Sequence, residues 1–227
     1  MEGLINLINL MIWSFFCIAS PLFIILFARI LTVPAKLFIR IHHGLPLTRL
    51  QINSVIFSFT SASTSLLIMG LISNVNPIGI IKCWVLLAWG IPLVLLDIRN
   101  FWLPFCFTTG FWLTGILFSL LPDNTTQFTE SVISSGIMFA FMRLFHYCVN
   151  RKHPEERFGL GDVHLIAALC AWIQWQLASL LCAMGFIIFI AAALITRKHT
   201  QAYAPWLFAF IALLATFLPL QTIQGVL

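Results

Sequence analysis

Long apolar runs separated by short polar segments follow one another along the whole chain. A helix that crosses a bilayer needs about 20 predominantly apolar residues, and most of these runs have roughly that length. The pattern therefore predicts an all-α chain, a single membrane domain over residues 1–227 that is polytopic, with about eight transmembrane helices. We place the helices at residues 6–28, 52–72, 78–97, 103–121, 128–148, 162–175, 177–195 and 205–222.

The composition indicates that lipid is the main solvent of this chain. Of its 227 residues, 61% are hydrophobic and 8% are charged, whereas a soluble domain carries about 25% charged residues. A globular core of this size does not bury so much apolar surface. The six cysteines form no CxxC pair and fall in or beside apolar runs, which indicates small core side chains rather than metal ligands or disulfides.

The basic residues predict how the chain is oriented. Eleven of the 12 lysines and arginines fall in or beside residues 29–51, 98–102, 149–161 and 196–204, and Lys82 is the exception. Positive charge marks the cytoplasmic ends of membrane helices, so both termini are expected to face outward and 29–51 to be a short cytosolic loop. No basic run is interleaved with aromatic residues, so we expect no nucleic-acid partner.

Two of the seven acidic residues are distinguished by their positions. Asp97 ends the apolar run GIPLVLLD, and Asp162 begins the run GDVHLIAALCAW. In the predicted orientation both lie on the cytosolic side at the edge of the lipid, where an ionised carboxylate is costly and usually functional. Taken singly, Asp162 is equally well explained as a helix N-cap, and Asp97 as a cap or a partner of Arg99. The other five acids lie at the N-terminus or in segments that water solvates.

Taken together, the two carboxylates fit a general acid–base pair. Two carboxylates that approach each other share one proton, which leaves one as a base to activate water and the other as an acid to protonate a leaving amine. Gly159 and Gly161 precede Asp162 and allow both a sharp turn and the close approach of a substrate backbone. The sequence therefore predicts Asp97 and Asp162 as catalytic residues, with the two glycines shaping the site.

Three segments around these residues resemble a known family. The stretches LLDIRNFWLP (95–104), FGLGDVHLIAALCAWIQWQ (158–176) and YAPWLFAFIAL (203–213) are similar, in this order, to segments of the type IV prepilin peptidases, which are membrane aspartic proteases of the GxGD class. The resemblance implies a peptidase-like region over residues 78–222. It also gives Pro205 a role in shaping the site, because Pro205 matches a proline of the family's last helix.

The resemblance carries expectations about function. It implies an endopeptidase of the bacterial inner membrane that removes the leader peptide of type IV prepilins or related pseudopilins at the cytosolic face. Asp97 and Asp162 match the family's catalytic aspartates, and the peptidase step needs neither a metal nor another cofactor. The expected partners are the prepilin substrate and membrane lipid; the particular prepilin and the oligomeric state stay open.

The chain departs from the family in two places. Many members carry zinc-binding cysteine pairs in a large cytosolic loop, and they also methylate the new N-terminus with S-adenosylmethionine. Here residues 29–51 are short and contain no cysteine, so S-adenosylmethionine is expected only if that second activity is present. His164 stands where the family usually has Lys. It is either a cationic neighbour of Asp162 or an inward-facing side chain with a structural hydrogen bond.

Two other functions remain open at this point. Paired intramembrane acids carry ions or protons in transporters, and an inactive relative of an enzyme can serve as a scaffold for pilus or secretion assembly. A transporter predicts inverted repeats and broken helices near the membrane midplane. The sequence shows no repeat, and both acids lie at one interface.

Overall fold

The computed structural model describes residues 2–72, 77–121, 127–151, 158–196 and 201–217, and these form α-helices without a strand. The all-α prediction is confirmed. Five helices are long and apolar enough to cross a bilayer, namely α1 over Ala19–Ile41, α2, α3, α5 and α7, while α4, α6 and α8 are shorter. In chain order the helices are α1 (Glu2–Ile41), α2 (Arg49–Ile72), α3 (Pro77–Asn100), α4 (Phe105–Ser119), α5 (Phe128–Asn150), α6 (Leu160–Trp172), α7 (Trp175–Thr196) and α8 (Ala204–Phe217).

The first helix is where the sequence prediction was wrong. Residues 29–51 do not form a loop, because α1 continues to Ile41 with Pro34 inside it. A buried stripe at helical spacing, including Ala28, Ala35 and Ile39, holds this extension against the rest of the chain. The packing of that stripe outweighs the hydrogen bond that Pro34 removes. The connection between α1 and α2 is therefore only residues 42–48.

The end of α1 has the geometry of a helix stop. The N–H of Gly44 donates to the carbonyl of Ile39 at 2.9 Å, and the N–H of His43 donates to the carbonyl of Arg40 at 3.4 Å. His43 adopts a left-handed conformation with φ 54°. This is the Schellman pattern, with His43 at the position where glycine is usual. The predicted boundaries of the later helices agree with the structure to within three residues, apart from the end of α8, which lies outside the described residues.

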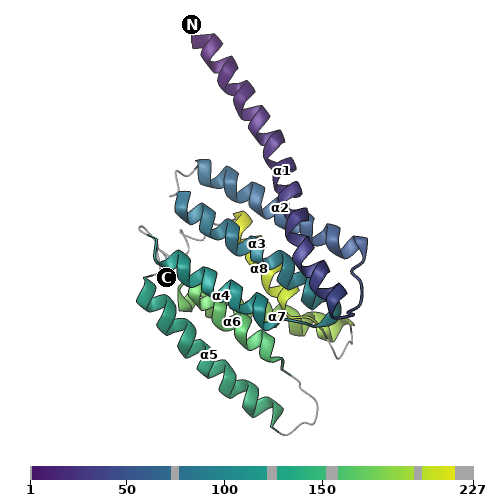
Figure 1. The fold of residues 1–227 in the computed structure, drawn as a ribbon. Coiled ribbons are helices and arrows are strands. Elements are labelled where there is room, and N and C mark those ends of the chain that lie inside the picture. Colours follow the sequence, from purple (N-terminus) through teal and green to yellow (C-terminus); the bar gives the residue numbers. More distant parts are fainter. Residues whose placement is uncertain (1, 73–76, 122–126, 152–157, 197–200, 218–227) are drawn as a thin grey trace.

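The helices form two packed groups (Figure 1). The groups contact each other through α3, which packs on α4, and through α7, which packs on both α8 and α6. One group contains α1, α2, α3 and α8, and the N-terminal part of α1 extends well beyond it. In the other group α6 lies against both α4 and α5. Every residue of α6 from Val163 to Trp172 except His164 is buried, so this short helix is the core of its group. The core also contains Cys83, Cys170 and Cys182, whereas Cys106 and Cys148 are exposed, contrary to expectation.

Candidate active site

Asp97 lies one turn before the end of α3 and is only 4% exposed. The helix stops immediately afterwards, because Phe101 adopts a left-handed conformation with φ 55° and its N–H donates to the carbonyl of Asp97 at 3.0 Å. A residue with a Cβ carries a cost of about 1–2 kcal/mol in this conformation. The tight stop therefore fixes the last turn of α3, and with it the direction of the Asp97 side chain.

The Asp97 carboxylate caps a different helix from its own. Its Oδ2 accepts a hydrogen bond from the backbone N–H of Ala204 at 2.8 Å. Ala204 is the first residue of α8 and is fully buried. The first N–H groups of a helix have no partner within the helix and favour negative charge. Of the two single-residue explanations, a cap is thus correct for Asp97, although the helix that it caps lies 107 residues further along the chain.

Asp162 is half-buried in the first turn of α6. The N-cap of α6 is Gly159, so the N-cap explanation for Asp162 is wrong. A Cβ on Gly159 would lie 3.2 Å from Oδ2 of Asp162, which shows that the carboxylate folds back over this glycine. A Cβ on Gly161 would lie 2.5 Å from the Cβ of Leu103 and 3.0 Å from its carbonyl oxygen. Gly161 therefore allows α6 to approach the linker that follows Asp97's helix.

Asp97 and Asp162 both act on the segment at the start of α8. Asp97 binds the Ala204 N–H. Burial raises the pKa of the Tyr203 phenol well above its usual range, and the charges of Cys182 and Asp162 act in the same direction. The Tyr203 O–H donates a hydrogen bond to the carbonyl oxygen of Cys182 at 3.1 Å. The start of α8 is thus hydrogen-bonded to the acid of α3 and is also influenced by the charge of the acid of α6.

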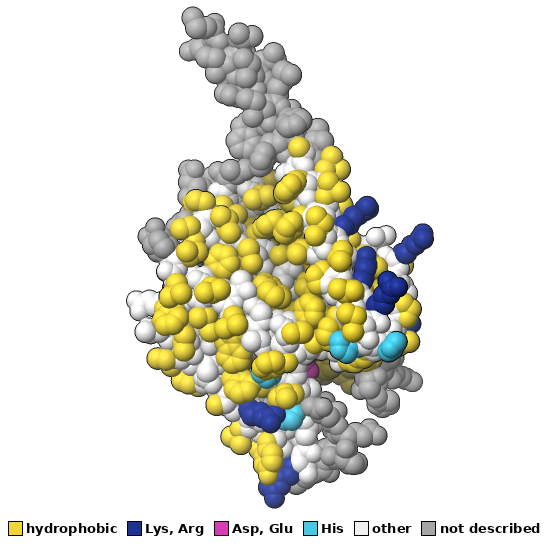
Figure 2. Space-filling view, in the orientation of Figure 1, with side chains coloured by type: hydrophobic (Ala, Val, Ile, Leu, Met, Phe, Trp, Pro, Cys, Tyr) yellow, Lys and Arg dark blue, Asp and Glu magenta, His cyan; other side chains and the backbone are white. Residues whose placement is uncertain are grey.

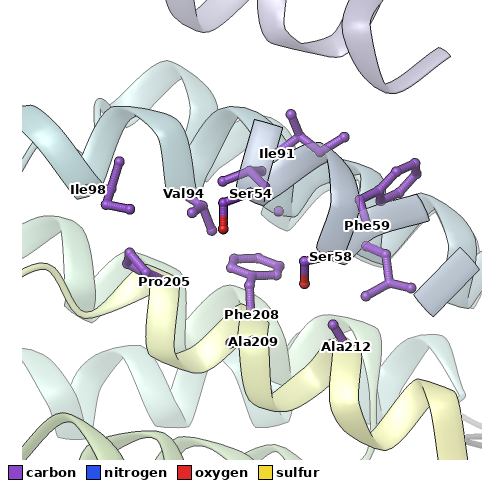
Figure 3. A pocket seen from close by; sticks show the side chains of 13 residues that line it. Ser54, Ser58, Phe59, Ile91, Val94, Ile98, Pro205, Phe208, Ala209 and Ala212 are labelled. Carbon is purple, nitrogen blue, oxygen red and sulfur yellow. The ribbon is translucent and has the colours of Figure 1, made fainter. Parts of the chain in front are cut away.

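An apolar groove begins beside this point. It is lined by α2, α3 and α8 and has a volume of about 160 Å³. One end is formed by Ile98, the neighbour of Asp97, and by Pro205, the neighbour of Ala204. Ser54 and Ser58 are the polar side chains in its wall, and Phe208 projects into it (Figure 3). Pro205 lies in the first turn of α8, where a proline removes no helical hydrogen bond.

Comparison with known proteins identifies the segment that carries this geometry. Residues 84–196 match the type IV leader peptidase family. The chain belongs to the type IV leader peptidase family. The match includes Asp97, Asp162 and both glycines of the α6 turn, whereas Pro205 lies beyond it.

Curated relatives of the chain carry the corresponding names. It is 26% identical over 130 residues to a prepilin leader peptidase/N-methyltransferase of Pectobacterium carotovorum subsp. carotovorum, covering 54% of this chain and 46% of the relative. It is 27% identical over 138 residues to a protein of the same name in Dickeya chrysanthemi, covering 57% and 48%. It is 29% identical over 91 residues to a type 4 prepilin-like proteins leader peptide-processing enzyme of Escherichia coli O78:H11 (strain H10407 / ETEC), covering 39% and 33%.

These matches cover only part of this chain and part of each relative. The chain spans less than half the length of these curated relatives. No solved structure matches it. Of the acids that we expected to be solvated, Asp123, Glu155 and Glu156 lie outside the described residues, and Glu130 is in the first turn of α5.

His164 has aromatic surroundings in this member of the type IV leader peptidase family. Its ring lies among aromatic side chains of α4 and α5, with centroid distances of 5.0 Å to Phe105, 5.0 Å to Phe139 and 6.1 Å to Trp112. Its Nδ1 is buried without a hydrogen-bond partner. The expected structural hydrogen bond is absent at this atom. The ring therefore faces α4 and α5.

Sequence reasoning missed Asn100, the last residue of α3. Its Oδ1 accepts from the N–H of Leu45 at 2.7 Å, and its Nδ2 donates to the carbonyl of Leu45 at 3.2 Å. A Cβ on Gly44 would lie 2.8 Å from the Trp102 ring and 3.1 Å from the Asn100 Oδ1. Asn100 therefore ties the α1–α2 connection to the helix end that carries Asp97. The signal available in the sequence was a polar residue three positions after Asp97.

Proposed function

We propose that this chain is an aspartic endopeptidase that removes the leader peptide of type IV prepilins or related pseudopilins at the cytosolic face of the bacterial inner membrane. Asp97 and Asp162 are the catalytic pair. The observation that carries the proposal is that Asp97 is hydrogen-bonded to Ala204 at the start of α8, while the charge of Asp162, 65 positions further along the sequence, acts on the preceding residue, Tyr203. The names of the relatives support the substrate class.

The chemistry follows from the surroundings of each acid. Asp97 is almost fully buried, and Asp162 is half-buried. Carboxylates in such different environments differ in their tendency to hold a proton, so one acts as base toward water while the other protonates the leaving amine. The pair titrates as a unit. Such a step needs no metal and no other cofactor, and S-adenosylmethionine enters only with a separate methylating activity.

The groove beside the acids suits the substrate class. Its apolar wall of α2, α3 and α8 would receive an apolar segment, and its end at Ile98 and Pro205 would hold that segment with its terminus at Asp97. The small residues Ala209 and Ala212 in the wall allow close approach of a helix backbone. A helix in the groove would therefore present the peptide bond at its end to the two acids.

The test is co-expression with a prepilin, with substrate size followed on a gel. We expect Asp97→Asn and Asp162→Asn each to leave the prepilin full-length, and Glu130→Gln, an acid at the start of α5, to process it normally. Normal processing by both aspartate variants would refute the proposal. Substrate that co-purifies with the unaltered chain but is never cut would point to a scaffold, and ion flux in liposomes that depends on Asp97 would point to a transporter.

A further inference from the structure

A cavity with cationic side chains lies at the corner between α1 and α2. It is lined by Lys36, Ile39, Arg40, His43, Gly44, Pro46, Leu47 and Ile52, and its volume is about 580 Å³. It is separate from the apolar groove beside Asp97, with which it shares no lining residue. No residue of this cavity is used by the proposed peptidase chemistry.

The cations of this cavity are built into one helical face. Lys36 and Arg40 are one turn apart on α1, so their side chains leave the helix on the same side. His43 follows in the left-handed position that ends the helix. Among the described residues, no carboxylate is paired with Lys36 or Arg40. The cavity thus presents an ammonium, a guanidinium and an imidazole with no acid among its lining residues.

The preference for positive charge at cytoplasmic helix ends explains the sign of these residues but not their arrangement. Figure 2 shows dark-blue side chains gathered at one edge of the molecule next to a broad yellow surface, and little magenta among the described residues of this face. The apolar residues Leu37, Ile41 and Leu45 are exposed beside the cations. Cations next to exposed apolar side chains match a molecule that has both an anionic group and hydrocarbon.

The corner between α1 and α2 is also fixed by side-chain contacts with the end of α3. Gly44 lines the cavity and packs on Trp102. The next residue, Leu45, forms the two hydrogen bonds with Asn100 at the end of α3. The rings of Phe38 and His42 add edge contacts to Trp102, at centroid distances of 6.3 Å and 6.4 Å. A ligand in the cavity would therefore bind a preformed site.

We propose that this cavity is a binding site for the phosphate headgroup of an anionic phospholipid, with Lys36 and Arg40 on the phosphate and the exposed apolar residues on the acyl chains. The site adjoins the Asn100 contact, so lipid bound there stabilises the α1–α2 corner against the helix end that carries Asp97. The site is defined by α1 and residues 42–48, and its occupancy does not depend on peptidase activity.

The test measures binding of fluorescent phosphatidylglycerol, and of phosphatidylcholine with the same chains, to the purified full chain in neutral detergent. We expect phosphatidylglycerol to bind more tightly. Lys36→Gln and Arg40→Gln should each weaken its binding about fivefold, and the double variant about 25-fold. Arg151→Gln removes a charge from an exposed arginine just after α5 and should leave binding unchanged. Lys36→Arg keeps the charge and should retain binding.

Three results would overturn the proposal. Equal binding of the two lipids would remove the role of the headgroup charge. If Arg151→Gln weakened phosphatidylglycerol binding as much as Lys36→Gln or Arg40→Gln, the effect would depend on the net charge of the chain and not on this cavity. Full displacement of phosphatidylglycerol by millimolar inorganic phosphate would assign the cavity to free phosphate rather than to lipid. Unchanged thermal midpoints show that the glutamine variants are folded, and none of these readouts involves prepilin cleavage.

Discussion

Replacing Asp97 separates the two roles that its position allows. Its carboxylate accepts the hydrogen bond of the buried Ala204 N–H, and it is also a proposed catalytic group. Asparagine keeps an acceptor at the same place but cannot exchange the proton that acid–base catalysis requires. Alanine removes both the acceptor and the carboxylate. A structural role and a chemical role therefore predict different patterns for the two variants.

The magnitudes follow from the contact. A hydrogen bond to a charged group contributes about 1.5–3 kcal/mol, and leaving a buried N–H without a partner costs about 1–3 kcal/mol. We therefore expect Asp97→Ala to lose about 2–3 kcal/mol, which corresponds to a fall in thermal midpoint of roughly 4–12 °C for a chain of this size. Asp97→Asn should lose less than about 1 kcal/mol, because it forfeits only the charge at the start of α8.

The loss of cleavage activity in the two Asp97 variants should not parallel their loss of stability. Both variants lose a group worth about 10²–10⁴-fold in rate, so both should fall to background cleavage. The assays are thermal unfolding in detergent and the initial rate of prepilin cleavage. An Asn variant that retains cleavage within tenfold of the unaltered chain would refute the catalytic role. An Asn variant as unstable as the Ala variant would refute the argument from the Ala204 hydrogen bond.

Three further changes, the first with a matched control, test the surroundings of the site. Gly161→Ala places a Cβ against Leu103 and should lower the free energy of unfolding by about 1–3 kcal/mol, measured by thermal unfolding. The control is Gly136→Ala, where a Cβ meets nothing within 4 Å and stability should rise by up to about 1 kcal/mol. Equal effects of the two variants would refute the close approach of α6. Asn100→Ala should speed tryptic cleavage next to Arg49 by freeing the α1–α2 connection, and an unchanged rate would exclude that role. Tyr203→Phe removes the hydrogen bond to Cys182 and should cost about 1 kcal/mol with cleavage retained; loss of cleavage in a folded variant would give the hydroxyl a chemical role.

The sequence was sufficient for most helices because an apolar run of the right length leaves few alternatives in lipid. It was insufficient at α1, where the basic residues suggested a loop and the stripe that includes Ala28, Ala35 and Ile39 was overlooked. That stripe has helical spacing, so the signal was present. The end of α1 could not be predicted from a glycine at the left-handed position, because His43 occupies that position and the glycine follows one residue later.

The surroundings of the site depended on contacts between distant residues. Asp97 could be selected as an acid at the end of an apolar run, but its partner Ala204 could not be inferred, since nothing local relates two positions 107 apart. The same holds for Asn100 and Leu45, which are 55 apart. The aromatic neighbours of His164 could not be predicted, because they come from α4 and α5 and helix-to-helix packing is not encoded in its own segment.

The brevity of α4 and α6 has a consequence for the membrane itself. At 1.5 Å per residue, the 13 residues of α6 span about 20 Å and the 15 residues of α4 about 22 Å, whereas a bilayer's hydrocarbon core is about 30 Å thick. α6 is enclosed by protein, but α4 exposes Leu113 and Leu117. If α4 crosses the bilayer, local thinning of the lipid is one way to match its length. Thinning there would bring bulk water closer to Asp162, and water is the reactant that the proposed peptidase step consumes.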